Sequence, residues 1–208
     1  MYSSRDLKDL RADVRANCEI FISECKKAGY PVLVTQTVRD AEYQAQLYKN
    51  GYAKTSVPSF HGVKAGLAFD ICKNIKGQEY SDNAFWQGVA KIGKEMGFTW
   101  GGDWKSFPDK PHFQWDNHGR YTNAMVRAGN YPPQMEEYMT QEKFNEMMGV
   151  YRSTLGKKPA SSWAKTSIEE MKRKKTKAGM AVTDGTRPGD LITREEVIVM
   201  LDRLSASL

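Results

Sequence analysis

The 208-residue sequence has only three cysteines, three histidines and no long apolar run. Cys18, Cys25 and Cys72 are odd in number and show no CxxC spacing, which argues against a disulfide scaffold or a thiolate metal site. No stretch approaches the roughly 20 apolar residues of a membrane-spanning helix. The first residues, MYSSRDLKDLRADVR, carry too many charges for a secretory signal. We therefore expect a protein made in the cytoplasm without a signal peptide and not inserted into a membrane.

The composition is that of a folded, basic protein. Hydrophobic residues make up 40% of the chain and aromatic residues 11%, which supports a packed core. The formal net charge of +6 favours polyanionic partners, which include nucleic acid, anionic lipid and the acidic polymers of bacterial walls. No nucleic-acid-reading motif is recognisable, and the aromatic residues gather around the histidines instead. We therefore expect no nucleic-acid partner.

Apolar periodicity divides the first part of the sequence into helices and short strands. The helices are expected at 6–27, 40–50 and 83–96, and the strands at 31–38, 66–72, 98–100 and 112–115. Helices followed by short strands joined by turns are typical of an α+β fold. We therefore expect a small antiparallel sheet with flanking helices.

The composition changes near residue 129, where GNYPP interrupts the pattern. A polar helical piece is expected at 140–151 and a basic helix at 163–177. TREE at 193–196 has the form of a capping box that opens another helix. The expected parts are a domain over 1–128, a linker with a helical segment over 129–159, and a small helical module over 160–208. A module of about 45 residues buries little core by itself.

Two segments combine histidine with aspartate. In SFHGVKAGLAFD, Asp70 directly follows an apolar run that His61 precedes, and in DKPHFQW, Asp109 precedes His112. A buried carboxylate costs several kcal/mol unless a cation or good donors meet it. Two imidazoles and one carboxylate are a common ligand set for catalytic zinc, and a second carboxylate can accept a proton. By spacing alone, one surface histidine, one core histidine and two turn-capping aspartates remain the alternative.

Four motifs in order carry a family resemblance over residues 5–125. They are Arg39-x4-Gln44-x2-Leu47-Tyr48-x2-Gly51, Ser59-x-His61 with Gly66-x-Ala68-x-Asp70, Gly101-Gly102-Asp103-Trp104, and Asp109-x-x-His112. Together they resemble the zinc D-alanyl-D-alanine peptidase superfamily, which includes the vancomycin-resistance dipeptidases and the L-alanyl-D-glutamate endopeptidases of bacteria and phages. The Gly-Gly-Asp-Trp motif is similar to the endopeptidase branch.

The resemblance implies a role for each matching residue. His61, Asp70 and His112 would be the ligands of one zinc ion, which would be the counter-charge of the buried carboxylate. Asp109 would match the catalytic carboxylate that activates the attacking water and passes the proton to the leaving amine. Arg39 would face the scissile carbonyl and stabilise the developing oxyanion, although a salt bridge at a helix start is its alternative. Candidates for substrate binding or for support of the site are Ser59, Gln44, Trp104 and Gln114.

The sequence departs from the family pattern at two places. The spacing from His61 to Asp70 is two residues longer than is usual, so the loop that carries His61 should bulge while the strand before Asp70 stays intact. Gln114 stands where many relatives have glutamate, which removes a charge beside His112. His118 lies in DNHG, a typical turn sequence, and is expected at the surface.

The C-terminal part resembles one S-layer-homology-like repeat. The resemblance rests on Trp163-Ala164-Lys165, Gly179-Met180, Thr183 to Pro188 and Thr193 to Glu196. It implies binding to anionic polymers of Gram-positive walls, which suits the basic run MKRKKTK at 171–177, although a solvated helix face is the alternative. A lone repeat would cover its apolar faces by forming a homo-oligomer or by docking on the peptidase.

These resemblances favour a zinc peptidase that cleaves the stem peptide of peptidoglycan. The similarity to the endopeptidase branch indicates the bond between L-Ala and D-Glu. Such a protein would be a phage endolysin or an autolysin, acting at the bacterial cell wall after release. A D,D-carboxypeptidase or dipeptidase with the same zinc centre is one alternative. A non-catalytic wall-binding protein is another, and it needs no stoichiometric metal.

Overall fold

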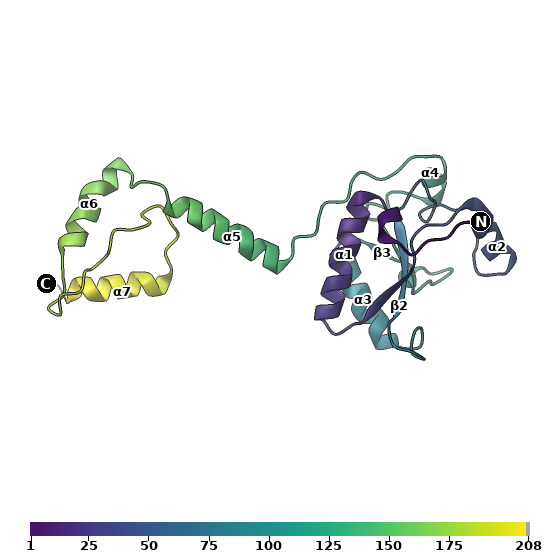
Figure 1. The fold of residues 1–208 in the computed structure, drawn as a ribbon, viewed down its shortest axis with the longest axis horizontal. Helices are drawn as coiled ribbons and strands as arrows, with labels where there is room; N and C mark the ends of the chain where they lie inside the picture. Colours follow the sequence, from purple (N-terminus) through teal and green to yellow (C-terminus); the bar gives the residue numbers. More distant parts are fainter. Residues whose placement is uncertain (207–208) are drawn as a thin grey trace. The chain divides into compact units, whose positions relative to one another are not determined.

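The computed structural model describes residues 1–206 and divides the chain into two compact units, Met1–Tyr138 and Met139–Leu208 (Figure 1). The first unit is a four-stranded antiparallel sheet with helices, which confirms the predicted α+β class. Its elements are the 3-10 helix η1 (Leu7–Asp9), α1 (Ala12–Lys27), β1 (Val32–Gln36), α2 (Ala41–Lys49), β2 (Ala68–Lys73), α3 (Asn83–Glu95), β3 (Thr99–Trp100), the 3-10 helix η2 (Gly101–Asp103), β4 (His112–Gln114) and α4 (Asn123–Arg127).

The strand order β1-β2-β4-β3 gives the sheet two chemically different faces. Phe69 of β2 lies opposite Phe113 of β4, and their stacked rings are 5.7 Å apart between centroids. Phe21 of α1 packs on both rings, so the core lies on this face, which α1 and α3 cover in Figure 1. Because side chains alternate along a strand, Asp70 and His112 project from the other face. The same pairing register therefore builds the core and places the polar residues.

The predicted helix over 6–27 is interrupted at residues 10–11, between η1 and α1. Arg11 N–H donates there to the Gly66 carbonyl at 2.9 Å. Gly66 has φ +57°, and a Cβ at this position would lie 2.7 Å from Arg11 N. Only glycine allows this crossing of two backbone segments. A tertiary contact thus divides a segment whose apolar spacing alone is continuous.

The segment between α4 and the second unit has no helix or strand but is held tightly to α1. Arg11 donates to the carbonyl oxygens of Pro132 at 2.8 Å and Pro133 at 2.9 Å. Asp13 accepts two bonds of 2.7 Å from Arg11 and one of 2.6 Å from Met135 N–H. The Arg11–Asp13 pair therefore fastens this segment to the first unit.

Asp13→Ala should lower the free energy of unfolding of the first unit by about 2 kcal/mol, since it removes charge-assisted hydrogen bonds. Burial opposes ionisation of Asp13, but the bonds from Arg11 and Met135 outweigh it and lower its pKa. The stabilisation is therefore complete above the unfolded-state pKa of about 3.9 and is lost as the pH falls through the lower folded-state pKa. Urea unfolding at pH 7 and below pH 3 measures both effects. The exposed Glu19→Ala on the same helix is the matched control, and equal stability of the two variants would contradict the role of Asp13.

The second unit contains α5 (Gln141–Gly156), α6 (Ser162–Arg173) and α7 (Arg194–Ser205). The predicted capping box is confirmed, because the side chains of Thr193 and Glu196 each accept from the other's backbone N–H. The helix predicted to run to residue 177 ends at Arg173, since Lys175 pairs with Ala181 in a β-bridge instead.

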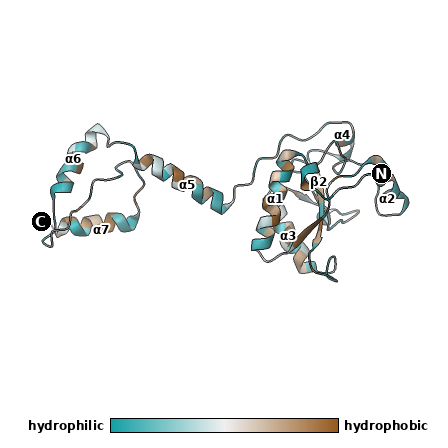
Figure 2. Cartoon of the chain, viewed as in Figure 1, coloured by the Kyte–Doolittle hydropathy of each residue, from teal (hydrophilic) through white to brown (hydrophobic). Residues whose placement is uncertain are grey.

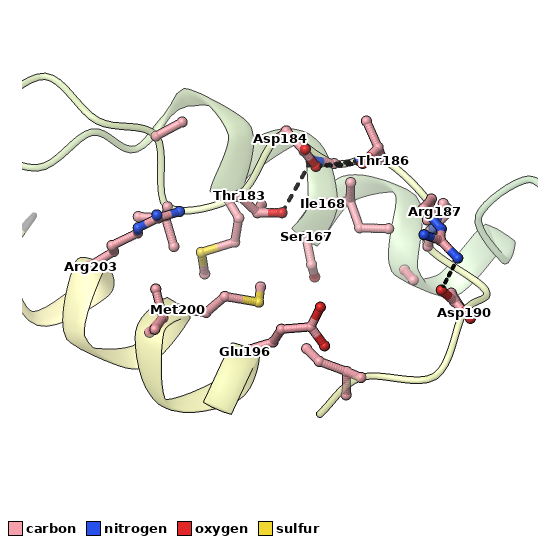
Figure 3. Close-up of a pocket in the computed structure, with 18 of the residues that line it drawn as sticks. Ser167, Ile168, Thr183, Asp184, Thr186, Arg187, Asp190, Glu196, Met200 and Arg203 are labelled. Atoms are coloured by element: carbon pink, nitrogen blue, oxygen red, sulfur yellow. Dashed lines mark hydrogen bonds and ion pairs between the residues drawn. The ribbon is translucent and has the colours of Figure 1, made fainter. Parts of the chain in front are cut away.

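The second unit buries very little. Among its described residues only Thr176 and Val182 are buried, and several large apolar residues of α5 and α7 are exposed. Figure 2 colours the ribbon of these helices by the hydropathy of each residue. Residues of α6, of α7 and of the loop before α7 line a hollow of about 1150 Å³ (Figure 3). Among residues 1–206, every helix is too short or too polar to cross a lipid bilayer.

Candidate metal centre

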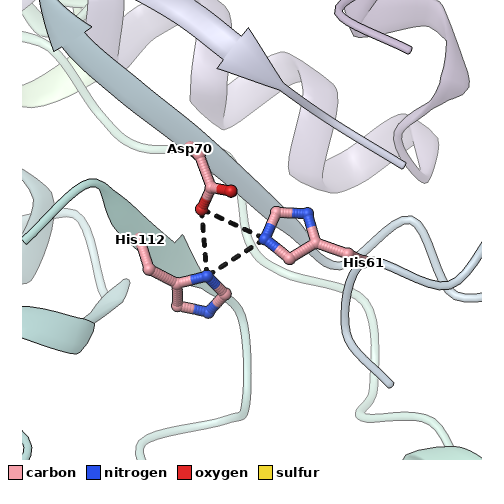
Figure 4. Close-up of side chains that lie close together, drawn as sticks. All are labelled: His61, Asp70 and His112. Carbon is pink, nitrogen blue, oxygen red and sulfur yellow. Dashed lines mark hydrogen bonds and ion pairs between the residues drawn. The ribbon is translucent and has the colours of Figure 1, made fainter. Parts of the chain in front are cut away.

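Three side chains that the sequence singled out meet on the polar face of the sheet. Asp70 of β2 lies directly opposite His112 of β4, and His61 comes from the loop between α2 and β2 (Figure 4). Asp70 Oδ1 lies 3.1 Å from His61 Nε2 and 3.1 Å from His112 Nδ1. The two imidazole nitrogens are 3.0 Å apart. These three atoms form a nearly equilateral triangle.

The loop that carries His61 forms a compact turn. Gly66 N–H donates to the Gly62 carbonyl at 3.0 Å, and Leu67 N–H donates to the Phe60 carbonyl at 2.9 Å. The loop therefore closes on itself between Phe60 and Leu67. His61 stays at the base of the loop, within reach of the strand that carries Asp70.

A backbone carbonyl sets the tautomer of His61. Its Nδ1 lies 2.6 Å from the carbonyl oxygen of Thr37, which can only accept a hydrogen bond. Nδ1 must therefore carry the proton. The neutral ring then presents the lone pair of Nε2 toward Asp70 and His112.

A chain of side chains sets the tautomer of His112. Its Nε2 lies 2.9 Å from Gln114 Oε1, and the Gln114 amide nitrogen donates to Asp116 Oδ2 at 2.8 Å. Asp116 is buried and is fixed by Thr99 Oγ1 at 2.7 Å and Gly119 N–H at 2.8 Å. The carbonyl end of Gln114 thus faces His112, so Nε2 carries the proton and Nδ1 offers its lone pair. The sequence analysis missed Asp116, because it lies beyond the end of β4 in a turn sequence that by itself suggests only a cap.

With both imidazoles neutral, the triangle brings together three lone pairs and no hydrogen atom, an arrangement suited to a cation. Donors about 2.0–2.1 Å from a tetrahedral zinc ion lie roughly 3.3 Å from each other, close to the observed separations. Burial lowers the pKa of His61, and, against its own burial, Asp70 has a pKa well below the usual range because of the two histidines. Burial also opposes the charged form of His112, but the hydrogen bond to Asp70 outweighs it and raises the pKa of His112. A neutral imidazole and an ionised carboxylate are the metal-binding forms. This donor set fits a metal ion.

Arg39 lies beside this centre, just beyond the end of β1. Its guanidinium Nη1 is 3.7 Å from Asp70 Oδ2, and its Nε–H donates to Gln44 Oε1 at 2.5 Å. Its backbone N–H donates to the His61 carbonyl at 2.8 Å. The side chain is only 15% exposed, so its positive charge is directed at the centre rather than at bulk water.

Asp109 occupies the turn that leads into β4. Its N–H donates to the Gly101 carbonyl at 2.9 Å, and its carbonyl accepts from His112 N–H at 3.2 Å. A Cβ on Gly101 would lie 2.6 Å from the Asp109 carbonyl oxygen and 3.0 Å from His112 Cβ, so this approach requires glycine. Within the part of the chain that the structure describes, the Asp109 carboxylate has no hydrogen-bond or ion-pair partner. Burial raises the pKa of Asp109, and it remains a free acceptor beside the centre.

Of the other residues considered in the sequence analysis, Trp104 contacts His112, Ser59 supports the loop that carries His61, and His118 lies elsewhere. The Trp104 ring packs 5.0 Å from the His112 ring and covers it. Ser59 Oγ is hydrogen-bonded to Asn123 Oδ1 of α4, which ties the His61 loop to that helix. His118 is exposed in a turn with φ +57° and lies outside the cluster.

The chain is similar to known peptidoglycan peptidases. Residues 53–115 match the family described as D-alanyl-D-alanine carboxypeptidase. The chain is 31% identical over 122 residues to the peptidoglycan L-alanyl-D-glutamate endopeptidase CwlK of Bacillus subtilis, covering 51% of this chain and 73% of that protein. It is 32% identical over 134 residues to the L-alanyl-D-glutamate peptidase of Listeria phage A118, covering 62% of this chain and 47% of that protein.

Among solved structures, the L-Ala D-Glu endopeptidase ChiX of Serratia marcescens matches with a TM-score of 0.45 and 21% identity. That match covers 58% of this chain and 93% of the other.

Proposed function

Because this chain belongs to the D-alanyl-D-alanine carboxypeptidase family, we propose that it is a zinc-dependent peptidoglycan hydrolase that cuts the stem peptide between L-alanine and D-glutamate. The convergence of three metal-binding side chains on one point carries the proposal, since their lone pairs suit a bound cation. The segment matched by the family contains all three of these side chains and Asp109. The bond is the one named for CwlK and for the phage relative.

His61, Asp70 and His112 would hold one zinc ion, and among residues 1–206 no other His, Cys, Asp or Glu joins this group. When bound, zinc supplies Lewis-acid chemistry, polarising a peptide carbonyl and lowering the pKa of water. Gln114 and Asp116 keep His112 in the tautomer that binds the metal.

Two further side chains would carry the reaction. The free carboxylate of Asp109 would take a proton from the attacking water and deliver it to the leaving amine, as a general base and then a general acid. Arg39 would stabilise the negative charge that develops on the scissile carbonyl oxygen. Gln44 holds Arg39 through its Oε1, while Trp104 would form one wall of the substrate site.

Digestion of defined muropeptides tests the proposed bond. Mass spectrometry of the products should find a new amino end on D-glutamate and a new carboxyl end on L-alanine. The family description favours a second candidate, a D,D-carboxypeptidase. That activity would release D-alanine from the end of the stem and create no amino end on glutamate, so one digest separates the two.

For residues 160–208 we propose binding to the bacterial wall. The positive run at 171–177 supports attraction to an anionic wall polymer. The exposed apolar residues of α7 support a homo-oligomer as the way in which so small a module covers its apolar surface. The protein would thus act at the cell wall, as an endolysin or autolysin.

Removing the positive charges at 172–175 should slow the lysis of whole cells but leave the cleavage of small muropeptides unchanged. The full-length variant Lys172→Gln, Arg173→Gln, Lys174→Gln, Lys175→Gln should lyse whole cells more slowly and cleave small soluble muropeptides at the wild-type rate. The difference should be largest at low salt, where screening is weakest. Turbidity loss and muropeptide turnover measure the two activities, and a truncation after Tyr138 should behave in the same way. A folded variant that fails equally on both substrates would instead show that the second unit completes the active site.

A further inference from the structure

A glutamine that the motifs do not include lies in the same cross-strand row as the candidate metal ligands. Gln36 of β1 pairs with Asp70 of β2, which pairs with His112 of β4. This alignment depends on a β-bulge, because the register shifts between Val34 and Gln36. Without the additional residue, Thr35 would face Asp70 instead. The bulge therefore brings a long polar side chain to the rim of the centre.

Both ends of the Gln36 amide are engaged. Its Oε1 accepts from Nη1 of Arg39, and its Nε2 donates to Ser3 Oγ at 2.7 Å. Gln44 holds the other edge of the guanidinium in the same manner, since its Oε1 accepts from Arg39 Nε and its Nε2 donates to the Thr55 carbonyl at 2.7 Å. Two amide carbonyls thus hold one buried guanidinium from two sides.

The position of Arg39 matters because its nearest carboxylate is a candidate metal ligand. Nη1 stops 3.7 Å from Asp70 Oδ2, which is beyond hydrogen-bond distance. A guanidinium free to move would close on this carboxylate and form a charge-assisted bond. Such closure would compete with the metal for Asp70 and would withdraw the positive charge from the substrate carbonyl.

We infer that Gln36 is a positioning residue that holds Arg39 away from Asp70 and aimed at the substrate. The inference rests on the proposed role of Arg39 in the peptidase reaction. Because a guanidinium can only donate, the acceptor at position 36 is the essential feature, and the bond to Ser3 only completes the amide. In this row, Asp70 of β2 and His112 of β4 would bind the metal, and Gln36 of β1 would hold the positive charge of Arg39 in place.

Full-length zinc-loaded variants test the acceptor directly. Gln36→Leu should lower kcat on the order of 10-fold with little change in KM and should weaken zinc binding by a similar factor. Gln36→Glu keeps an acceptor and should restore kcat to within about threefold of wild type. Gln36→Met provides a second apolar variant, and Gln46→Leu on the exposed face of α2 is the control. Thermal unfolding confirms that each variant is folded.

A measurement independent of turnover separates this inference from the proposed function. The Arg39 Nη–H resonances, identified by their loss in Arg39→Lys, should exchange faster with solvent in Gln36→Leu than in wild type, because Gln36 accepts from Nη1. If the wild type cleaves no muropeptide, the proposed function fails, and the exchange rate and zinc affinity still test the positioning. Wild-type exchange and zinc affinity in Gln36→Leu would overturn the inference. So would a Gln36→Glu protein as defective as Gln36→Leu.

Discussion

Asp70→Ala should yield a folded protein that neither retains zinc nor hydrolyses peptidoglycan fragments. Asp70 Oδ1 is equidistant from the two imidazole nitrogens, so it supplies one third of the donor set and its only negative charge. With that charge removed, two neutral imidazoles would face the positive Arg39. Two neutral donors beside a guanidinium are a poor site for a divalent cation.

Metal analysis and thermal unfolding check this result without any assay of activity. The wild type should hold one zinc per chain and gain about 2.7 kcal/mol of stability at a free zinc concentration of 100 Kd. Asp70→Ala and His112→Ala should show neither the bound zinc nor the gain. Glu95→Gln, an exposed carboxylate on α3, should match the wild type. One zinc per chain in both ligand variants would remove these residues from the site.

The sequence analysis selected these three residues through the family resemblance, and one local signal agreed with that choice. Asp70 directly follows the apolar residues Leu67 to Phe69, where a carboxylate needs a counter-charge, and the pairing of β2 with β4 then places His112 opposite it. Gln36 gave no such signal, since its place in the row depends on a bulge that strand periodicity does not reveal. Asp116 acts through Gln114, and its turn sequence alone suggests only a cap.

The same distinction applies to the fold: elements set by local sequence are predictable, and features set by contacts between distant residues are not. The spacing of apolar residues predicted α3 well, because its buried face and its Asp82 cap are both local features. The interruption before α1 depends on Gly66, more than fifty residues away in sequence, and no pattern near Leu10 indicates it. Likewise, the stretch beyond α4 is held by Arg11 through backbone carbonyls, which leave no trace in residue type.

Asp109→Asn should keep the zinc and the fold but lower kcat by about 10²–10⁴-fold, the usual cost of losing a general base. Asparagine has nearly the same shape, and the contacts that place the turn use the Asp109 backbone rather than its side chain. The substitution therefore removes a proton acceptor and leaves the approach to Gly101 intact. Turnover of a soluble muropeptide at equal zinc content measures the effect.

The neighbouring Asp103→Asn is the matched control for this variant, since Asp103 is exposed and pairs with Lys94 at 3.0 Å. It should turn over at the wild-type rate. Asp109→Ala adds a second test, because a small carboxylate such as formate can enter the space left by the side chain and restore part of the rate. Rescue that grows with formate concentration in Asp109→Ala, and is absent in Asp70→Ala, would separate proton transfer from metal binding. Wild-type turnover by Asp109→Asn would exclude Asp109 as the base, whatever its position beside the centre.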